Sequence, residues 1–226
     1  NLLSSGSTAT IVGTTVNAGA DVTVAAEEAA DLWATDDSAM EVSSTGGLVT
    51  TNVLLASALA SVTGSHVTAG GDIEVAATNT AALTAHAVST ISGLEGKSVV
   101  LAFNSVGWRP SNVLFNLAEA VLGSTPISEA FGGESPAMAS ATVTDSVLVA
   151  GGDLRIIALD AVQLDALAGN ENISGAGDSI FFDRPGGAGP SSTPKVGGFG
   201  KTGLSVGGVV ASNKVSSAAL ATLTGG

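Results

Sequence analysis

The sequence lacks cysteine and tyrosine and contains few aromatic or charged residues. Without cysteine, neither a disulfide nor a thiolate metal site can form. Aromatic residues make up 4% of the chain and charged residues 12%, and this charged fraction is about half that of an average globular domain. Apolar residues make up 45%, yet no run of 18 consecutive apolar residues occurs, so the sequence predicts no membrane-spanning helix.

The chain has 20 acidic and 7 basic residues, which gives it a formal charge of −13. Such a chain repels phosphate backbones and anionic lipids, so we expect no nucleic-acid partner and no membrane insertion. The charge is interpreted first as a means of keeping a weakly charged surface soluble, and second as an attraction for divalent cations. Only Gly175-Ala176-Gly177-Asp178 resembles a calcium-binding repeat, once and with the wrong glycine spacing. Calcium is therefore weakly indicated, and no other cofactor is expected.

Three segments share one phrase, in which an Ala-Gly-Gly-Asp or Ala-Gly-Ala-Asp tetrad lies between short apolar runs. Glycine permits turn conformations and the following aspartate can accept backbone N–H bonds, so the tetrads predict turns between strands. The predicted turn residues are Gly19, Asp21, Gly70, Gly71, Asp72, Gly151, Gly152 and Asp153. The first copy departs from the pattern, because Ala20 replaces the second glycine.

The tetrads recur at a spacing that one stretch of the chain disturbs. Asp21 and Asp72 are 51 residues apart, whereas Asp72 and Asp153 are 81 residues apart, an excess of 30. Residues 107–136 do not resemble the repeats, and removing them restores the period. We therefore interpret residues 107–136 as an insertion, and residues 170–203, which are also unlike the repeats, as a second one.

A second repeated motif, which follows each tetrad along the chain, ends in Asn52, Asn104 or Asn213. Asn52 and Asn104 are 52 residues apart, close to the spacing of the tetrads. Stacked asparagine side chains can hydrogen-bond to one another along a repeat. The sequence therefore predicts an asparagine ladder with a structural role.

Apolar residues alternate with polar or small ones within each repeat, as at Ile73, Val75 and Ala77. Such alternation predicts strands with one buried face. A propeller would carry more aromatic residues, and a sandwich would lack the repetition. We predict an all-β fold, a right-handed parallel β-helix (β-solenoid) that forms a single unit over residues 1–226.

The two insertions have different characters. Val113, Leu117 and Val121 lie four residues apart and predict a helix within residues 107–136. Residues 170–203 are rich in glycine, proline and serine and predict a long loop. The helix is interpreted first as structural cover for the rod and second as a docking element. The candidate partner contacts in or beside the insertions are Trp108, Phe115, Phe181 and Phe182.

No catalytic or metal-binding pattern emerges from the sequence. His66 and His86 have no ligand spacing between them, so we expect both to face solvent. The carboxylates of Glu27 and Glu28 are sequence neighbours, and adjacent side chains of a strand point to opposite faces. No nucleophile–base set or phosphate-binding glycine loop is found, so we predict that the chain is not an enzyme.

The tetrad phrase, with its alternating aliphatic residues, resembles the repeat regions of large bacterial surface and secreted proteins of the filamentous haemagglutinin and adhesin type. The resemblance leaves out the two insertions. It implies a right-handed β-helical shaft, an extracellular or cell-surface location, and a role in adhesion, biofilm or envelope structure. Because the chain starts in mid-pattern, we expect it to be an internal fragment of a longer protein.

Two functional classes remain open. The first is a structural segment of a stalk, filament or matrix, which self-associates end to end through open strand edges or contacts neighbouring repeats of the same chain. The second is a module that binds a cell-surface glycan or protein through the insertions. A glycan-cleaving β-helix enzyme is the least favoured alternative.

Overall fold

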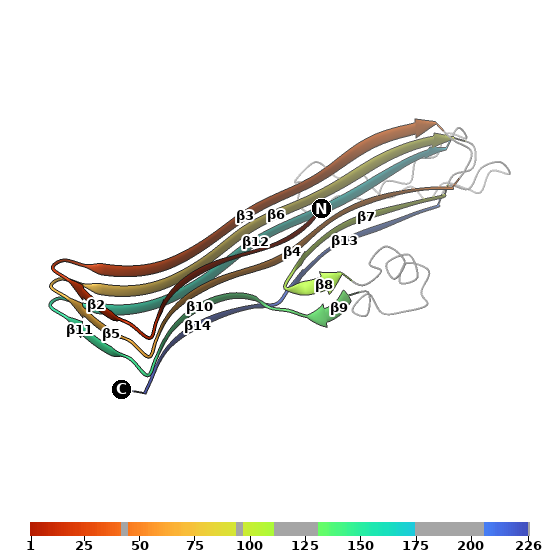
Figure 1. The fold of residues 1–226 in the computed structure, drawn as a ribbon. Coiled ribbons are helices and arrows are strands. Elements are labelled where there is room, and N and C mark those ends of the chain that lie inside the picture. Colours follow the sequence, from red (N-terminus) through yellow and green to blue (C-terminus); the bar gives the residue numbers. More distant parts are fainter. Residues whose placement is uncertain (42–44, 94–96, 111–130, 175–205, 226) are drawn as a thin grey trace, which may run out of the picture.

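The computed structural model describes residues 1–41, 45–93, 97–110, 131–174 and 206–225. Within these ranges the chain forms strands joined by short turns, and no helix is present. The strands belong to three parallel sheets and one small antiparallel pair (Figure 1). The prediction of an all-β fold is therefore confirmed.

The three parallel sheets are called A, B and C here. Sheet A contains β1 (Leu2–Val12), β4 (Thr45–Thr63), β7 (Lys97–Val106), β10 (Ala137–Thr144), β13 (Val206–Val215) and β14 (Ser217–Thr224). Sheet B contains β2 (Thr15–Ala18), β5 (His66–Ala69) and β11 (Val147–Ala150). Sheet C contains β3 (Val22–Glu41), β6 (Ile73–Gly93) and β12 (Leu154–Ser174).

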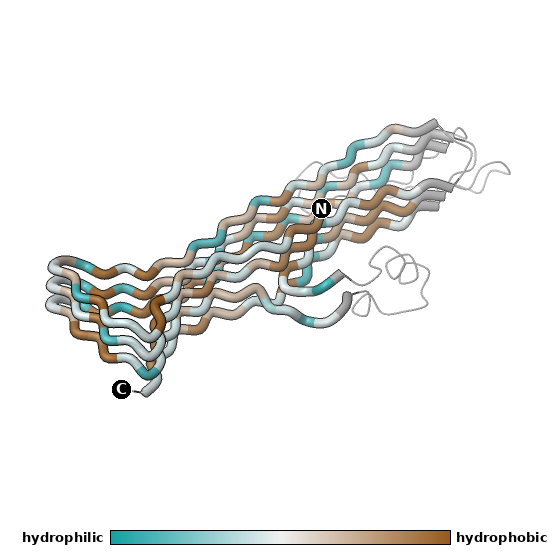
Figure 2. The backbone as a smooth tube through the Cα atoms, in the orientation of Figure 1, coloured by the Kyte–Doolittle hydropathy of each residue, from teal (hydrophilic) through white to brown (hydrophobic). Residues whose placement is uncertain are grey.

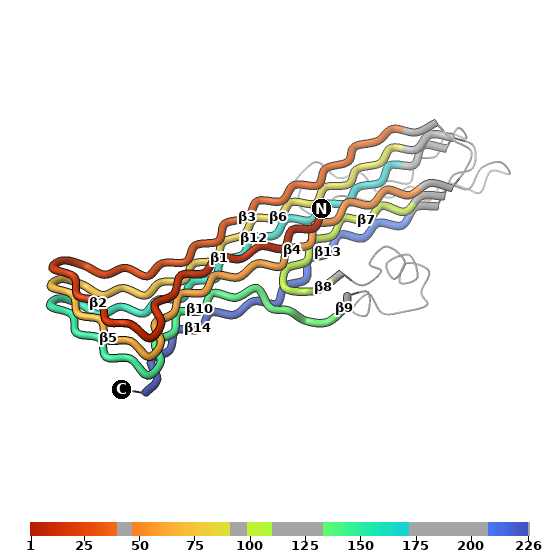
Figure 3. Tube along the Cα trace, viewed as in Figure 1, coloured from red at the N-terminus to blue at the C-terminus, as the bar shows by residue number. Residues whose placement is uncertain are grey.

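The chain passes through sheets A, B and C in that order and then returns to sheet A, so successive passes lie on one another as layers (Figure 3). Layer one is β1–β3 and layer two is β4–β6. Layer three comprises β7 and β10–β12, and layer four comprises β13 and β14. Equivalent residues of neighbouring layers pair in parallel register, as Val22, Ile73 and Leu154 do. The three tetrad phrases are thus stacked one above another.

The insertion at residues 107–136 interrupts a strand of sheet A, so that β7 and β10 together occupy the place opposite the single strand β4. In layer four a single residue, Ser216, joins the positions that Val106 and Ala137 occupy in layer three. The first and last parts of the insertion form β8 (Trp108–Pro110) and β9 (Phe131–Glu134), which pair antiparallel. The predicted helix at residues 112–122 lies outside the described residues.

The second predicted insertion begins later than its composition indicates. Residues 170–174 continue β12, because they pair with Ser89–Gly93 of β6. Residues 175–205 lie outside the described residues, and β13 starts at Val206.

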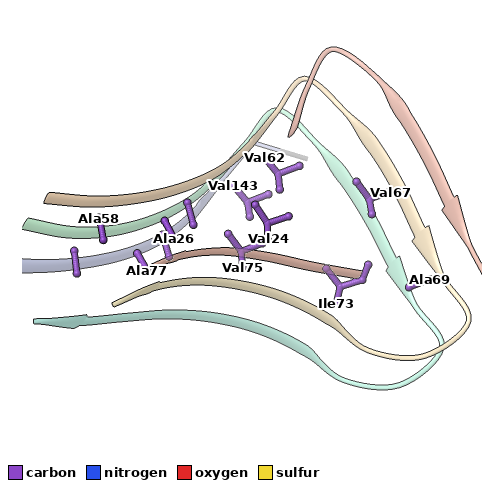
Figure 4. Packing of buried hydrophobic residues seen from close by; sticks show 13 residues of the cluster. Val24, Ala26, Ala58, Val62, Val67, Ala69, Ile73, Val75, Ala77 and Val143 are labelled. Atoms are coloured by element: carbon purple, nitrogen blue, oxygen red, sulfur yellow. The ribbon is translucent and has the colours of Figure 1, made fainter. Parts of the chain in front are cut away.

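The core lies between sheets A and C, is closed at one end by Val67 and Ala69 of sheet B, and is built mainly from small aliphatic side chains. Strand residues alternate between buried and partly exposed, and Figure 4 shows Val75 and Ala77 of sheet C turned toward Ala58 and Val62 of sheet A. Layer two and the sheet A strands of layer three are the most deeply buried, because most of their residues have a paired strand on each side. The prediction that these strands have one buried face is confirmed.

Candidate functional site

The tetrads form a column of corners between sheets B and C. Oδ1 of Asp21 accepts a hydrogen bond from the backbone N–H of Asp72 at 2.8 Å. Oδ1 of Asp72 accepts one from the N–H of Asp153 at the same distance. Asp21 and Asp72 therefore each hold the corner of the next layer, and the predicted turn residues lie together.

The glycines of the tetrads are required by this stacking. A Cβ atom at Gly70 would overlap with the carbonyl oxygen of Gly19, and one at Gly71 would overlap with the carboxylate of Asp21. Gly151 and Gly152 stand in the same relation to layer two. Ala20 belongs to layer one, and no described aspartate lies against it from the other side.

The corner column is acidic and only partly neutralised. Arg155 donates to Oδ2 of Asp153 at 2.7 Å, and its other terminal nitrogen lies 3.7 Å from Oδ2 of Asp72. Among the described residues, no group of three or more His, Asp or Glu side chains is placed to hold a metal ion. Gly175–Asp178, the weak calcium-repeat match, lies outside the described residues. The hydrogen bonds of the column fix the backbone of successive corners.

Asparagines form a second column, inside the sheet A–sheet C core. The side-chain amide of Asn52 donates to Oδ1 of Asn104 at 3.0 Å, and that of Asn104 donates to Oδ1 of Asn213 at 3.0 Å. Asn1 extends the column, because its amide donates to Oδ1 of Asn52 at 2.9 Å. Asn1 was not among the predicted ladder residues, although it lies 51 residues before Asn52.

The asparagine column also ties the two large sheets together. The Asn52 amide donates to the backbone carbonyl of Thr84 at 2.7 Å, and the Asn104 amide to that of Asp165 at 2.6 Å. Both asparagine side chains are fully buried. Since a buried amide without partners would cost roughly 1–3 kcal/mol, these contacts explain how a polar row is accommodated in an alanine-rich core.

A third column was not recognised in the sequence. Glu28, Asn79 and Asp160 pair in register on sheet C and face the interior. The Asn79 amide donates to Oδ1 of Asp160 at 3.2 Å, and the Ser5 hydroxyl donates to Oε1 of Glu28 at 2.5 Å. Only the register reveals this column, because its three residues are of different types.

Burial affects the acid at the end of this third column. Desolvation raises the pKa of the Asp160 carboxyl above its ordinary value, although hydrogen bonds from the Ala218 backbone and the Asn79 side chain oppose the shift. The carboxylates of Glu28 and Asp160 are two layers apart, and the fully buried Asn79 fills the space between them. A substrate has no room between the two acids, so this arrangement does not support acid–base catalysis.

The aromatic residues that the structure describes lie in different surroundings. The Trp108 ring packs against Leu101 and Phe103, and the Lys214 ammonium lies 3.6 Å from the ring centroid. Trp108 is thus in contact with its own chain. Trp33, which the sequence did not single out, is 75% exposed on β3. Phe115, Phe181 and Phe182 lie outside the described residues.

The two histidines lie on the outer surfaces of different sheets. His66 is exposed on β5, and His86 is partly exposed on β6. Nε2 of His86 lies 2.8 Å from Oδ2 of Asp165 in the next layer. The structure does not bring the two histidines together.

The three columns thus connect equivalent positions of successive layers through hydrogen bonds. No helix in the described part of the chain is long and apolar enough to cross a membrane. Comparisons with family models, curated proteins and solved structures find no match to this chain.

Proposed function

We propose that the chain is a segment of a right-handed parallel β-helix that serves as a structural shaft. Its place would be in a large extracellular bacterial surface or filament-forming protein, with an adhesion, stalk or matrix role and no catalysis. One observation carries this proposal: equivalent residues of successive layers hydrogen-bond to one another through all three sheets.

The side-chain contacts support a structural role better than a binding role. The aspartate and asparagine columns connect each layer to the next through hydrogen bonds, as the repeating core of a shaft requires. The interior between sheets A and C is filled by small aliphatic side chains. Repeat proteins of this kind gain stability from the interfaces between neighbouring units.

Cryo-electron microscopy of the purified chain tests the architecture. We expect a particle that is longest along its strands, with the strands perpendicular to the axis along which the layers stack, and with a right-handed path of the backbone. A left-handed path would contradict the proposed fold class, and a compact globule would contradict a shaft.

The alternative, a binding module that uses the insertions, can be tested with a variant that lacks residues 107–136. Layer four shows how to close the gap, since Ser216 alone spans it. The variant therefore joins Val106 to Ala137 through one serine. It also carries Phe103→Thr, because Phe103 pairs with Thr51 in layer two and would otherwise be uncovered.

Binding of both proteins to a glycan array and to cultured host cells then separates the classes. A shaft keeps its fold and its surface properties when the insertion is removed. A binding module keeps its fold but loses a ligand that the parent chain binds. Release of sugar from the glycans by the parent chain would instead indicate an enzyme.

A further inference from the structure

Sheets A and C differ sharply in charge. Strands β1, β4, β10 and β14 contain no Asp, Glu, Lys or Arg, and the only charged residues of sheet A are Lys97 and Lys214. On sheet C, by contrast, β3 alone contains six acidic residues. In Figure 2, strongly hydrophilic residues recur along β3, whereas β1 has none. In a chain with a net charge of −13, the described strands of sheet A therefore carry no acidic side chain.

This surface, the neutral face, is the outer side of β1, β10, β14 and residues 55–63 of β4. Its side chains are mainly hydroxyl-bearing or aliphatic, and they include Leu220 and Met138, which are 48% and 36% exposed. Ala139 and Ala141, between the outward residues of β10, are fully buried and belong to the core. Phe103 and Ser105, further along sheet A, are covered, so the neutral face ends there.

We propose that the neutral face packs against the neutral face of a second copy, so that two rods lie side by side with their acidic sheets outward. Copies of a strongly acidic chain repel one another in every orientation that brings two sheet C surfaces together. Interface cores are depleted of charged residues, and two flat sheets with small side chains can pack face to face. The same surface on both copies gives a closed, two-fold pair.

The size of the neutral face sets the strength of the contact. Four strands about 4.8 Å apart and eight residues of about 3.3 Å each cover roughly 500 Å² per copy. A standard stable interface buries about 800 Å² per partner, so the pair is weak and transient for one segment. If several such segments follow one another in a longer rod, their contacts act together and strengthen the association. The inference rests on the charge distribution and does not require the proposed shaft function.

The absence of cysteine allows a direct test with single-cysteine variants. Ser57→Cys places a thiol in the middle of the neutral face, and Thr78→Cys places one at an equally half-buried, outward position of layer two on sheet C. Under mild oxidation we expect the Ser57→Cys protein to form disulfide-linked dimers about ten-fold faster than the Thr78→Cys protein. Added salt should raise the Ser57→Cys rate further, because it screens the repulsion between the acidic chains.

A charge introduced on the neutral face supplies the control. Leu59→Asp in the Ser57→Cys background should bring the dimerisation rate down to that of Thr78→Cys. If Leu59→Asp alters the thermal unfolding of the protein, Thr8→Glu, at an exposed position of layer one, replaces it. Equal rates for the two cysteine variants, or an unchanged rate after charge insertion in a folded protein, would overturn the proposal.

Discussion

Oδ1 of Asp21 occupies the position that a Cβ atom of residue 71 would need. The same atom accepts the backbone N–H of Asp72 at 2.8 Å, so the aspartate of one layer and the glycine of the next form a single unit. Glycine at this corner is therefore determined by the layer beneath it.

Alanine at Gly70 and at Gly19 should have very different effects on stability. A Cβ atom at Gly70 would meet the backbone carbonyl of Gly19, which cannot move alone, so we expect a loss of about 2–3 kcal/mol. A Cβ atom at Gly19 would meet nothing within 4 Å. Chemical denaturation of both variants measures the difference, and equal losses would show that the layers do not stack as described.

Removal of a buried asparagine should cost more than removal of one at the end of the column. Asn104→Ala takes away the donor to the Asp165 carbonyl and the acceptor of the Asn52 amide, so we expect a loss of about 2–4 kcal/mol. Asn213→Ala, at an exposed position in layer four, should cost about 1 kcal/mol or less. The free energies of unfolding in urea test this order, and a larger loss for Asn213→Ala would contradict the ladder.

The contribution of Asp160 to the stability of the protein should fall as the pH rises from the acid range. Because burial raises its pKa above the ordinary value of 3.8, its contribution is fully favourable below that value and is lost as the pH rises through the folded-state pKa. Asp160→Asn keeps an oxygen that can accept from Asn79, and it should raise the melting temperature at neutral pH but not at strongly acidic pH. Asp31→Asn, at an exposed position, is the matched control. A neutral-pH effect no larger than that of the control would refute this role of Asp160.

A column of left-handed residues marks the corner between sheets A and B, and it gives a test of backbone strain. Gly64 has φ of +58° and no atom within 4 Å of a Cβ position, so Gly64→Ala should cost about 1 kcal/mol through the backbone alone. Asp145 holds the same kind of conformation, with φ of 49°. Gly64→Asn should therefore be tolerated better than Gly64→Ala, since asparagine and aspartate enter this region more readily. Thermal unfolding of the two variants decides the point.

Identical residues at regular spacing allowed much of this fold to be predicted from the sequence. The tetrads around Asp21, Asp72 and Asp153 are nearly identical, and Asn52 and Asn104 recur at almost the same spacing, so both sets align directly. The sequence does not show, however, why a particular residue type is needed at each position. The need for glycine at position 71 becomes visible only when Asp21 is placed below it.

Columns of unlike residues could not be found in this way. Glu28, Asn79 and Asp160 share a position in the register but no side-chain type, so no repeat signal marks them. Asn1 was missed for another reason, because the phrase that identifies the other ladder asparagines is absent before it. The insertion at 107–136 was predicted from its lack of resemblance to the repeats and from the 30-residue excess in spacing, but its departure from the middle of a sheet A strand depends on pairing. Its helix remains a prediction.

The distance between paired strands has a consequence for how the chain acquires its structure. Among the described strands of sheets A, B and C, partners are never closer than 51 residues in sequence. Local contacts therefore cannot stabilise a lone layer, and the first pairing must overcome a large entropic barrier. Once two layers have met, each new one can form on an existing template. We expect slow nucleation by the first pair of layers followed by rapid propagation to the others, with refolding that is faster when folded protein is supplied as a template.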